Sequence, residues 1–108
     1  MPSFPGSQKN KIEFFIHRLY QGHEGEKLSK SEIMPKVQAF PFAPDEQVFF
    51  EELPDRSYSQ KELVKALNDI MQRRGRVQAM GGLLDIRNVE HPPAEWEEAF
   101  HRIYERRK

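Results

Sequence analysis

The sequence predicts one mainly helical domain, four or five short helices in a compact bundle, with a single β-hairpin that makes it α+β only at the margin. Three observations predict this class: apolar residues recur at helical spacing, Ser and Glu stand where helices are capped, and a Gly-Gly pair separates two five-residue runs. With 108 residues the chain has room for one domain. We expect that domain at residues 7–108, after a flexible tail at residues 1–6.

The first helix is expected to follow Ser7, whose side chain suits an N-cap. Gly22 and Gly25, among polar residues, end it and open a loop. The apolar stripe of this helix has the i, i+3, i+4, i+7 spacing and consists of Ile12, Phe15, Ile16, Leu19 and Tyr20.

A second helix is marked by Ser29 and Glu32, which have the spacing of a capping box. Pro35 falls inside the helix that this box begins. Because proline removes a backbone donor, two alternatives stay open: the helix is kinked, or it starts near Met34 with Pro35 in its first turn.

Two more helices follow along the chain. Pro44 opens a third helix and Pro54 stops it. Ser59 and Glu62 form a second capping box for the fourth helix, and Gly75 is its expected left-handed cap. The buried stripe of this fourth helix consists of Leu63, Val64, Leu67, Ile70 and Met71.

The Gly81-Gly82 pair predicts a hairpin over residues 76–87, because a two-residue primed turn needs positive φ at both positions. In that hairpin Val77 faces Ile86 on an apolar side that packs on the helices or on a further strand. After Pro92-Pro93, a last helix is expected over residues 93–107.

One internal echo is visible between residues 28–34 and residues 58–64, each of which follows a helix with a Phe-Phe pair. It indicates either a duplicated helix–turn–helix unit or the chance recurrence of a capping box.

The segment 28–67 resembles a family of short bacterial helical domains of unknown function. The resemblance rests on Ser29-Lys30, Glu32-Ile33, the run Pro44-Asp45-Glu46-Gln47-Val48 and the block Leu53-Pro54-Asp55-Arg56-Ser57-Tyr58. It covers about 40 of the 108 residues, and Pro35 departs from the family's uninterrupted first helix. The resemblance implies a fold and no activity.

Composition argues against most chemistry. Without cysteine there is no thiolate metal site and no cysteine nucleophile, and the four histidines lack metal-ligand spacing. We therefore expect no catalytic, cofactor-binding or metal-binding residues and no cofactor. No leader and no membrane span is recognisable, so we expect a cytoplasmic protein without a membrane partner.

Binding to another protein, or self-association, is the first functional hypothesis. The 17 basic and 17 acidic residues cancel in the whole chain. The charged residues within 44–55 are nevertheless all acidic, and those within 56–87 are mainly basic. Such a division suits electrostatic pairing. Phe49 and Phe50 are adjacent on the third helix, so their side chains cannot both point toward the same side of the core. One of them is therefore expected to be exposed or covered by another element. The candidate interface consists of Phe49, Phe50, Glu51 and Glu52.

Nucleic-acid binding is the alternative hypothesis. A helix at residues 59–74 followed by a hairpin at 76–87 has the order of a winged helix. Basic side chains at those places could contact phosphates, or an acidic partner. The candidate contacts are Lys65, Arg73, Arg74, Arg76 and Arg87.

Overall fold

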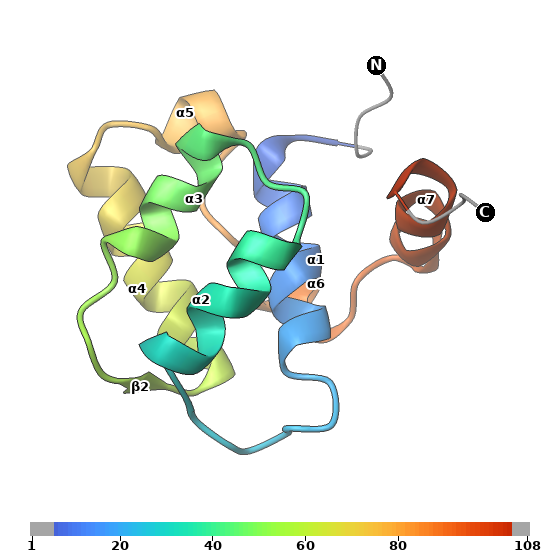
Figure 1. Ribbon diagram of the computed structural model, residues 1–108. Helices are drawn as coiled ribbons and strands as arrows, with labels where there is room; N and C mark the ends of the chain where they lie inside the picture. The colour runs from blue at the N-terminus through green and yellow to red at the C-terminus, as the bar shows by residue number, and fades with distance from the viewer. Residues whose placement is uncertain (1–5, 105–108) are drawn as a thin grey trace.

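The chain folds as two helix–loop–helix units followed by three further helices (Figure 1). The computed structural model describes residues 6–104. Its helices are α1 (Gln8–Leu19), α2 (Lys30–Ala39), α3 (Pro44–Glu51), α4 (Gln60–Arg73), α5 (Val77–Met80), α6 (Ile86–Glu90) and α7 (Ala94–Tyr104), and its strands are β1 (Leu28–Ser29) and β2 (Ser57–Tyr58). The predicted class, mainly α and α+β only at the margin, is confirmed, but the antiparallel strands of the described residues are β1 and β2 and do not form the predicted hairpin.

The two units meet through their loops. β1 lies between α1 and α2, β2 lies between α3 and α4, and the strands pair antiparallel, with Leu28 opposite Tyr58 and Ser29 opposite Ser57. The two echoed segments of the sequence therefore occupy equivalent places, one in each unit.

Both predicted capping boxes are formed. Ser29 Oγ accepts from Glu32 N at 3.2 Å, and Ser29 N donates to Glu32 Oε1 at 2.8 Å. Ser59 and Glu62 make the same pair of bonds at 3.2 and 2.9 Å. Each box satisfies two backbone donors at a helix start within four residues, which is why the sequence predicts these starts well.

Pro35 lies inside α2, which begins at Lys30, so the alternative start near Met34 is wrong. At the start of α1, Ser7 is the N-cap as predicted, but the bond runs the other way: Ser7 N donates to the Asn10 side chain at 3.0 Å.

The main core fills the space enclosed by helices α1 to α6. Phe15 is its central ring, with centroids 5.0 Å from Phe40, 5.0 Å from Phe42 and 5.4 Å from Phe50. Such tilted and edge-on ring contacts contribute beyond the area that they bury. Leu63, Leu67 and Ile70 of α4 close the other side of this core.

The hairpin predicted over residues 76–87 is wrong, and with it the wing of a winged helix. Residues 77–80 form one helical turn, in which Met80 N donates to Arg76 O at 3.0 Å. Gly81 and Gly82 have φ of 103° and 118°, as a primed turn also requires, but Gly81 here is the left-handed cap of that turn. Positive φ alone does not distinguish the two uses.

The second half of the predicted hairpin is bound by a distant side chain. Asp85 N donates to Glu13 Oε2 at 2.7 Å, so it has no strand partner. The Asp85 carboxylate in turn accepts from Arg87 N at 2.9 Å and caps α6. Neither bond can be read from the local pattern of alternating residues.

The last helix, expected over 93–107, is present as α7, residues 94–104, while 105–107 lie outside the described part of the chain. The tail expected at residues 1–6 lies outside it too, except for Gly6. Among residues 6–104, no helix has the length and apolar character that crossing a bilayer requires.

Candidate binding groove

The predicted basic contacts do not form one basic surface. Arg74 Nη1 lies 2.7 Å from Glu52, and Arg76 lies 3.8 Å from Asp45. The basic stretch therefore forms ion pairs with the acidic segment 44–55 of the same chain. Arg87 lies 3.5 Å from its neighbour Asp85. The charge division in the sequence is therefore partly neutralised by folding.

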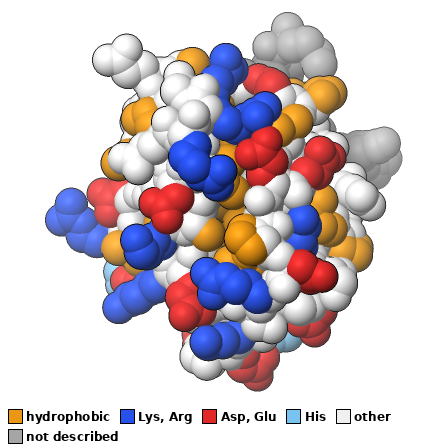
Figure 2. Space-filling model, turned by 90° about the vertical axis from the view of Figure 1, so that its left-hand side faces the viewer, with side chains coloured by type: hydrophobic (Ala, Val, Ile, Leu, Met, Phe, Trp, Pro, Cys, Tyr) orange, Lys and Arg blue, Asp and Glu red, His pale blue; other side chains and the backbone are white. Residues whose placement is uncertain are grey.

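Lys65 and Arg73 are exposed on α4, with Glu62 and Asp69 lining the same shallow hollow. On the face over α4, at the left of Figure 1, cationic and anionic side chains are interspersed with apolar ones (Figure 2). The continuous basic groove that favours nucleic acid is not visible on this face.

The predicted interface anchors lie in the core. Phe49 and Phe50 are 1% and 0% exposed, because the adjacent positions of α3 are covered from two directions by other elements. Neither ring is available as an anchor, which corrects that prediction. Glu51 and Glu52 are exposed: the Glu51 carbonyl accepts from Lys30 Nζ at 2.7 Å, and Glu52 pairs with Arg74.

Two carboxylates are buried at positions that the sequence does not single out. Glu46 is 2% exposed and accepts from Gln8 Nε2, Lys11 Nζ and Ala43 N at 2.8, 3.0 and 2.7 Å. Glu13 is fully buried. Its four donors are Lys9 Nζ at 2.6 Å, Asn10 Nδ2 at 2.9 Å, Asp85 N at 2.7 Å and Asn88 Nδ2 at 3.2 Å. A basic residue four positions before Glu13 is the one sequence signal for this site.

The two helix–loop–helix units invite comparison with a calcium site. Such units bind Ca²⁺ in EF-hands when a 12-residue loop brings carboxylate or amide oxygens at its positions 1, 3, 5 and 12. If position 12 is set at Glu32, positions 1, 3 and 5 are Gln21, His23 and Gly25. If it is set at Glu62, they are Glu51, the buried Leu53 and Asp55. Neither loop carries that oxygen set, and within residues 6–104 there is no group of three metal-ligating side chains.

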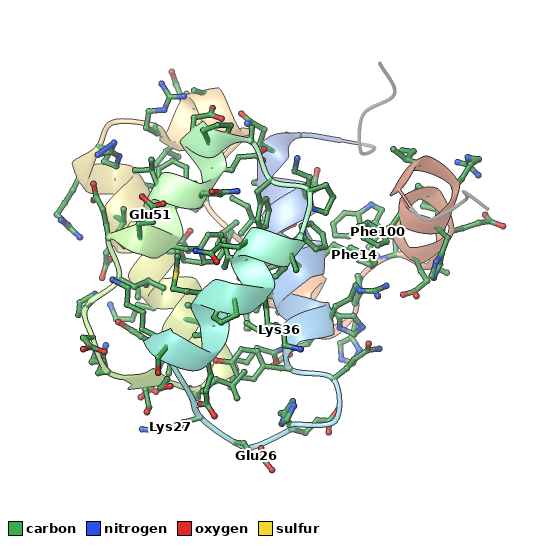
Figure 3. The ribbon with its side chains drawn as sticks, in the orientation of Figure 1. Phe14, Glu26, Lys27, Lys36, Glu51 and Phe100 are labelled. Atoms are coloured by element: carbon green, nitrogen blue, oxygen red, sulfur yellow. The ribbon has the colours of Figure 1, made fainter. Side chains whose placement is uncertain are left out.

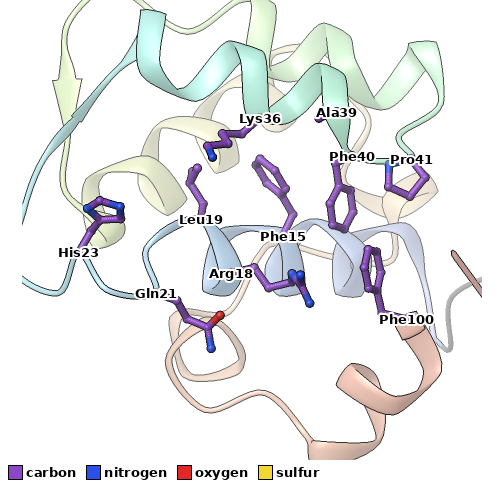
Figure 4. A pocket seen from close by; sticks show the side chains of 10 residues that line it. All are labelled: Phe15, Arg18, Leu19, Gln21, His23, Lys36, Ala39, Phe40, Pro41 and Phe100. Carbon is purple, nitrogen blue, oxygen red and sulfur yellow. The ribbon is translucent and has the colours of Figure 1, made fainter. Parts of the chain in front are cut away.

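The hollow that combines an aromatic floor with a uniform charge lies between the end of α1, the end of α2 and α7. It encloses about 350 Å³, within the range of ~300–1,000 Å³ typical of ligand sites. Figure 4 shows its aromatic side chains Phe15, Phe40 and Phe100, with Leu19 and Pro41 beside them. We call this hollow the α1–α2 groove.

All charged side chains that line the α1–α2 groove, among the described residues, are basic or histidine. Arg18 comes from α1, Lys36 from α2, and His23 from the loop between them (Figure 4). His23 Nδ1 lies 3.0 Å from Glu26, and Arg18 Nη1 lies 3.4 Å from Glu97. Lys36 is exposed at the rim, where an incoming carboxylate can reach its ammonium group. No acidic side chain lines the groove itself, among the described residues, and Glu26 and Glu97 lie beside it, against His23 and Arg18.

Two of the other three histidines, His17 and His101, have partners for their side chains. His17 Nδ1 lies 2.9 Å from the Val89 carbonyl and ties α1 to α6, and His101 Nε2 lies 3.0 Å from Glu97 one turn away on α7.

Comparisons with known proteins add no relative: no family model, no curated protein and no solved structure matches the chain. The function of this protein has therefore to be inferred from the chemistry of the α1–α2 groove.

Proposed function

We propose that this protein is a non-catalytic protein-interaction module that binds a partner segment in the α1–α2 groove. The segment supplies an apolar side chain, aromatic by preference, and at least one carboxylate. The observation that carries this proposal is the combination of an aromatic floor with a rim that contains the cations Arg18 and Lys36 and the imidazole of His23.

The two features favour a protein ligand for separate physical reasons. Burying an aromatic or large aliphatic side chain contributes ~1.5–3 kcal/mol, and such anchors dominate many interfaces. Rim cations add orientation and speed of association with an acidic partner more than raw affinity. A hollow of about 350 Å³ has room for a few side chains and leaves little for a large cofactor.

A displayed library of random dodecapeptides, selected on the full chain, tests the chemistry of the ligand. We expect enrichment of peptides that combine an aromatic residue with Asp or Glu. Lys36→Glu is expected to weaken these peptides about tenfold, because it places a carboxylate at the rim beside the ligand's own.

Lys61→Glu is the matched control, since Lys61 is also exposed but lies on α4, away from the groove. Equal loss in both variants, or enrichment of basic peptides, contradicts the proposal. Salt-sensitive binding of a DNA or RNA duplex that is weakened by Arg73→Ala with Arg76→Ala, together with no peptide enrichment, favours the nucleic-acid hypothesis instead.

A further inference from the structure

The ring contacts between helix α7 and the rest of the molecule centre on Phe100, and Trp96 is buried beside it in the same cluster. Phe100 stacks on Phe40, with centroids 5.1 Å apart and planes 13° apart, and it lies 5.4 Å from Phe14. The Arg18 guanidinium lies 4.9 Å from the centre of the same ring and 3.4 Å from Glu97. Figure 3 shows Phe14 and Phe100 facing each other between α1 and α7.

The main core closes without α7. Its buried residues all lie between Ile12 and Val89, whereas Trp96 and Phe100 of α7 form a separate small cluster with Phe14. In Figure 1, α7 stands at one side of the molecule, on the far side of α1 from α3 and α4. A short His91-Pro92-Pro93 segment connects it to α6. α7 is therefore an addition to a scaffold that is already complete.

The contacts of α7 use the same groups that the proposed ligand needs. Phe100 forms one wall of the α1–α2 groove, and Glu97 pairs with Arg18, one of its cations. A carboxylate and an aromatic ring three positions apart on a helix lie on one face, so a single helical segment can present both.

Resting on the proposed function, we infer that α7 is an intrachain occupant of an extended groove formed by Phe14, Arg18 and Phe40, and that the partner is an amphipathic helix of the same chemistry. The partner helix carries a carboxylate three positions before an aromatic residue. It displaces α7, takes over the Arg18 ion pair, and buries its ring against Phe14 and Phe40. Phe14, Phe40 and Arg18, which the partner contacts once α7 has left, all belong to the scaffold.

Tethering sets how strongly α7 competes. A segment on a short linker has an effective concentration on the order of 1 mM, and an isolated helix of this length is marginal in water. If the free α7 segment binds with a Kd of about 0.1 mM, the tethered copy occupies the groove about ten to one. The intact chain then binds any competing helix about tenfold more weakly than a chain whose α7 is released.

The test uses a fluorescent peptide with the sequence of residues 91–104 and the full-length chain, with anisotropy as the readout. Phe100→Ala in the chain loosens the tethered α7 while leaving Phe14, Arg18 and Phe40 in place, so the peptide is expected to bind about tenfold more tightly than to the unmodified chain. Glu97→Lys in the chain, which opposes Arg18 without removing apolar surface, gives a second route to the same increase. A peptide carrying Phe100→Ala is expected not to bind.

Glu98→Ala in the chain is the matched control, because Glu98 is exposed on α7. The inference is overturned if neither Phe100→Ala nor Glu97→Lys raises peptide affinity, or if Glu98→Ala raises it equally. If the α7 peptide fails to bind while library peptides still bind in a Lys36-dependent way, the inference fails and the proposed function stands. If both fail, the groove is not a peptide site.

Discussion

Phe14 and Phe15 are neighbours on α1 and are both buried, yet they belong to different parts of the molecule. Phe15 is 3% exposed and is surrounded by Phe40, Phe42 and Phe50 in the main core. Phe14 is 0% exposed, and its cluster consists of Trp96 and Phe100 of α7. Equal burial therefore has different settings: Phe15 belongs to the main core, and Phe14 is buried in the cluster that α7 forms with it, beside Phe40.

Burial alone therefore does not measure the contribution of a ring to stability. Removing a ring from the main core leaves a cavity that stays open, because the surrounding helices hold one another in place and cannot move in to fill it. Removing a ring under α7 allows the helix to shift or detach, because the remaining structure does not depend on it.

Truncating each of these two rings should separate them most clearly. Phe15→Ala is expected to lower the free energy of unfolding by about 3–5 kcal/mol, and Phe14→Ala by about half as much, because relaxation of α7 reduces the cavity cost. Urea unfolding followed by circular dichroism measures both. Equal losses would show that α7 is an integral part of the core.

For the hydrogen bonds of Glu13 inside the scaffold, we expect a loss of stability between those of Phe15→Ala and Phe14→Ala. Glu13→Ala leaves Asp85 N and the side-chain amides of Asn10 and Asn88 without their acceptor, so we expect a loss of about 3 kcal/mol. Glu98→Ala on α7, an exposed position, is expected to change stability by less than about 0.5 kcal/mol. Similar values from the same urea experiment would contradict the distinction between scaffold and appended helix.

The smallest expected effect is a dependence of the free energy of unfolding on pH, and it comes from Tyr20 in the scaffold. Burial first, and then the carboxylates of Glu62 and Glu32, raise the pKa of the Tyr20 phenol, whose hydroxyl donates to the Tyr58 carbonyl at 2.6 Å. Above about pH 10 the unfolded chain loses this proton and the folded chain keeps it, so the contribution of Tyr20 falls by up to about 1.4 kcal/mol per pH unit. Below about pH 10 that contribution is fully present.

Tyr20→Phe isolates the effect, because the variant removes only the phenol hydroxyl. The stability difference between the wild type and Tyr20→Phe is expected to shrink between about pH 9 and pH 11 in urea titrations. A difference that stays constant over this range would mean that Tyr20 ionises equally in the folded and unfolded chains.

The parts of the fold that sequence predicts well are those decided by neighbouring residues. The starts of α2 and α4 follow from Ser29 with Glu32 and from Ser59 with Glu62, because each cap is satisfied within four residues. The hairpin prediction fails where the deciding partner is distant: Glu13 lies 72 residues from the Asp85 backbone that it holds. Alternation of apolar and polar residues carries no information about such a bond.

The candidate site shows the same division. Adjacent phenylalanines on a helix point in different directions, so each needs its own packing surface to be buried. For Phe49 and Phe50 the main core provides both surfaces. The same requirement has more consequence for Phe14 and Phe15, since Phe14 packs against Trp96 and Phe100 of α7. The sequence contains that signal, but it does not reveal which pair is covered by an appended helix. The pairing of Arg74 with Glu52 across α4 and α3 is likewise a product of the tertiary fold.

Amide hydrogen exchange on the full-length chain tests directly whether α7 is a separable occupant of a complete scaffold. We predict that α7 amides exchange through a local opening at least about 2 kcal/mol below global unfolding, that α1 and α4 exchange only with global unfolding, and that Phe100→Ala accelerates exchange in α7 alone. Exchange of α7 with the same opening free energy as α4, in the wild type and in Phe100→Ala, would show instead that α7 and the scaffold unfold as one unit.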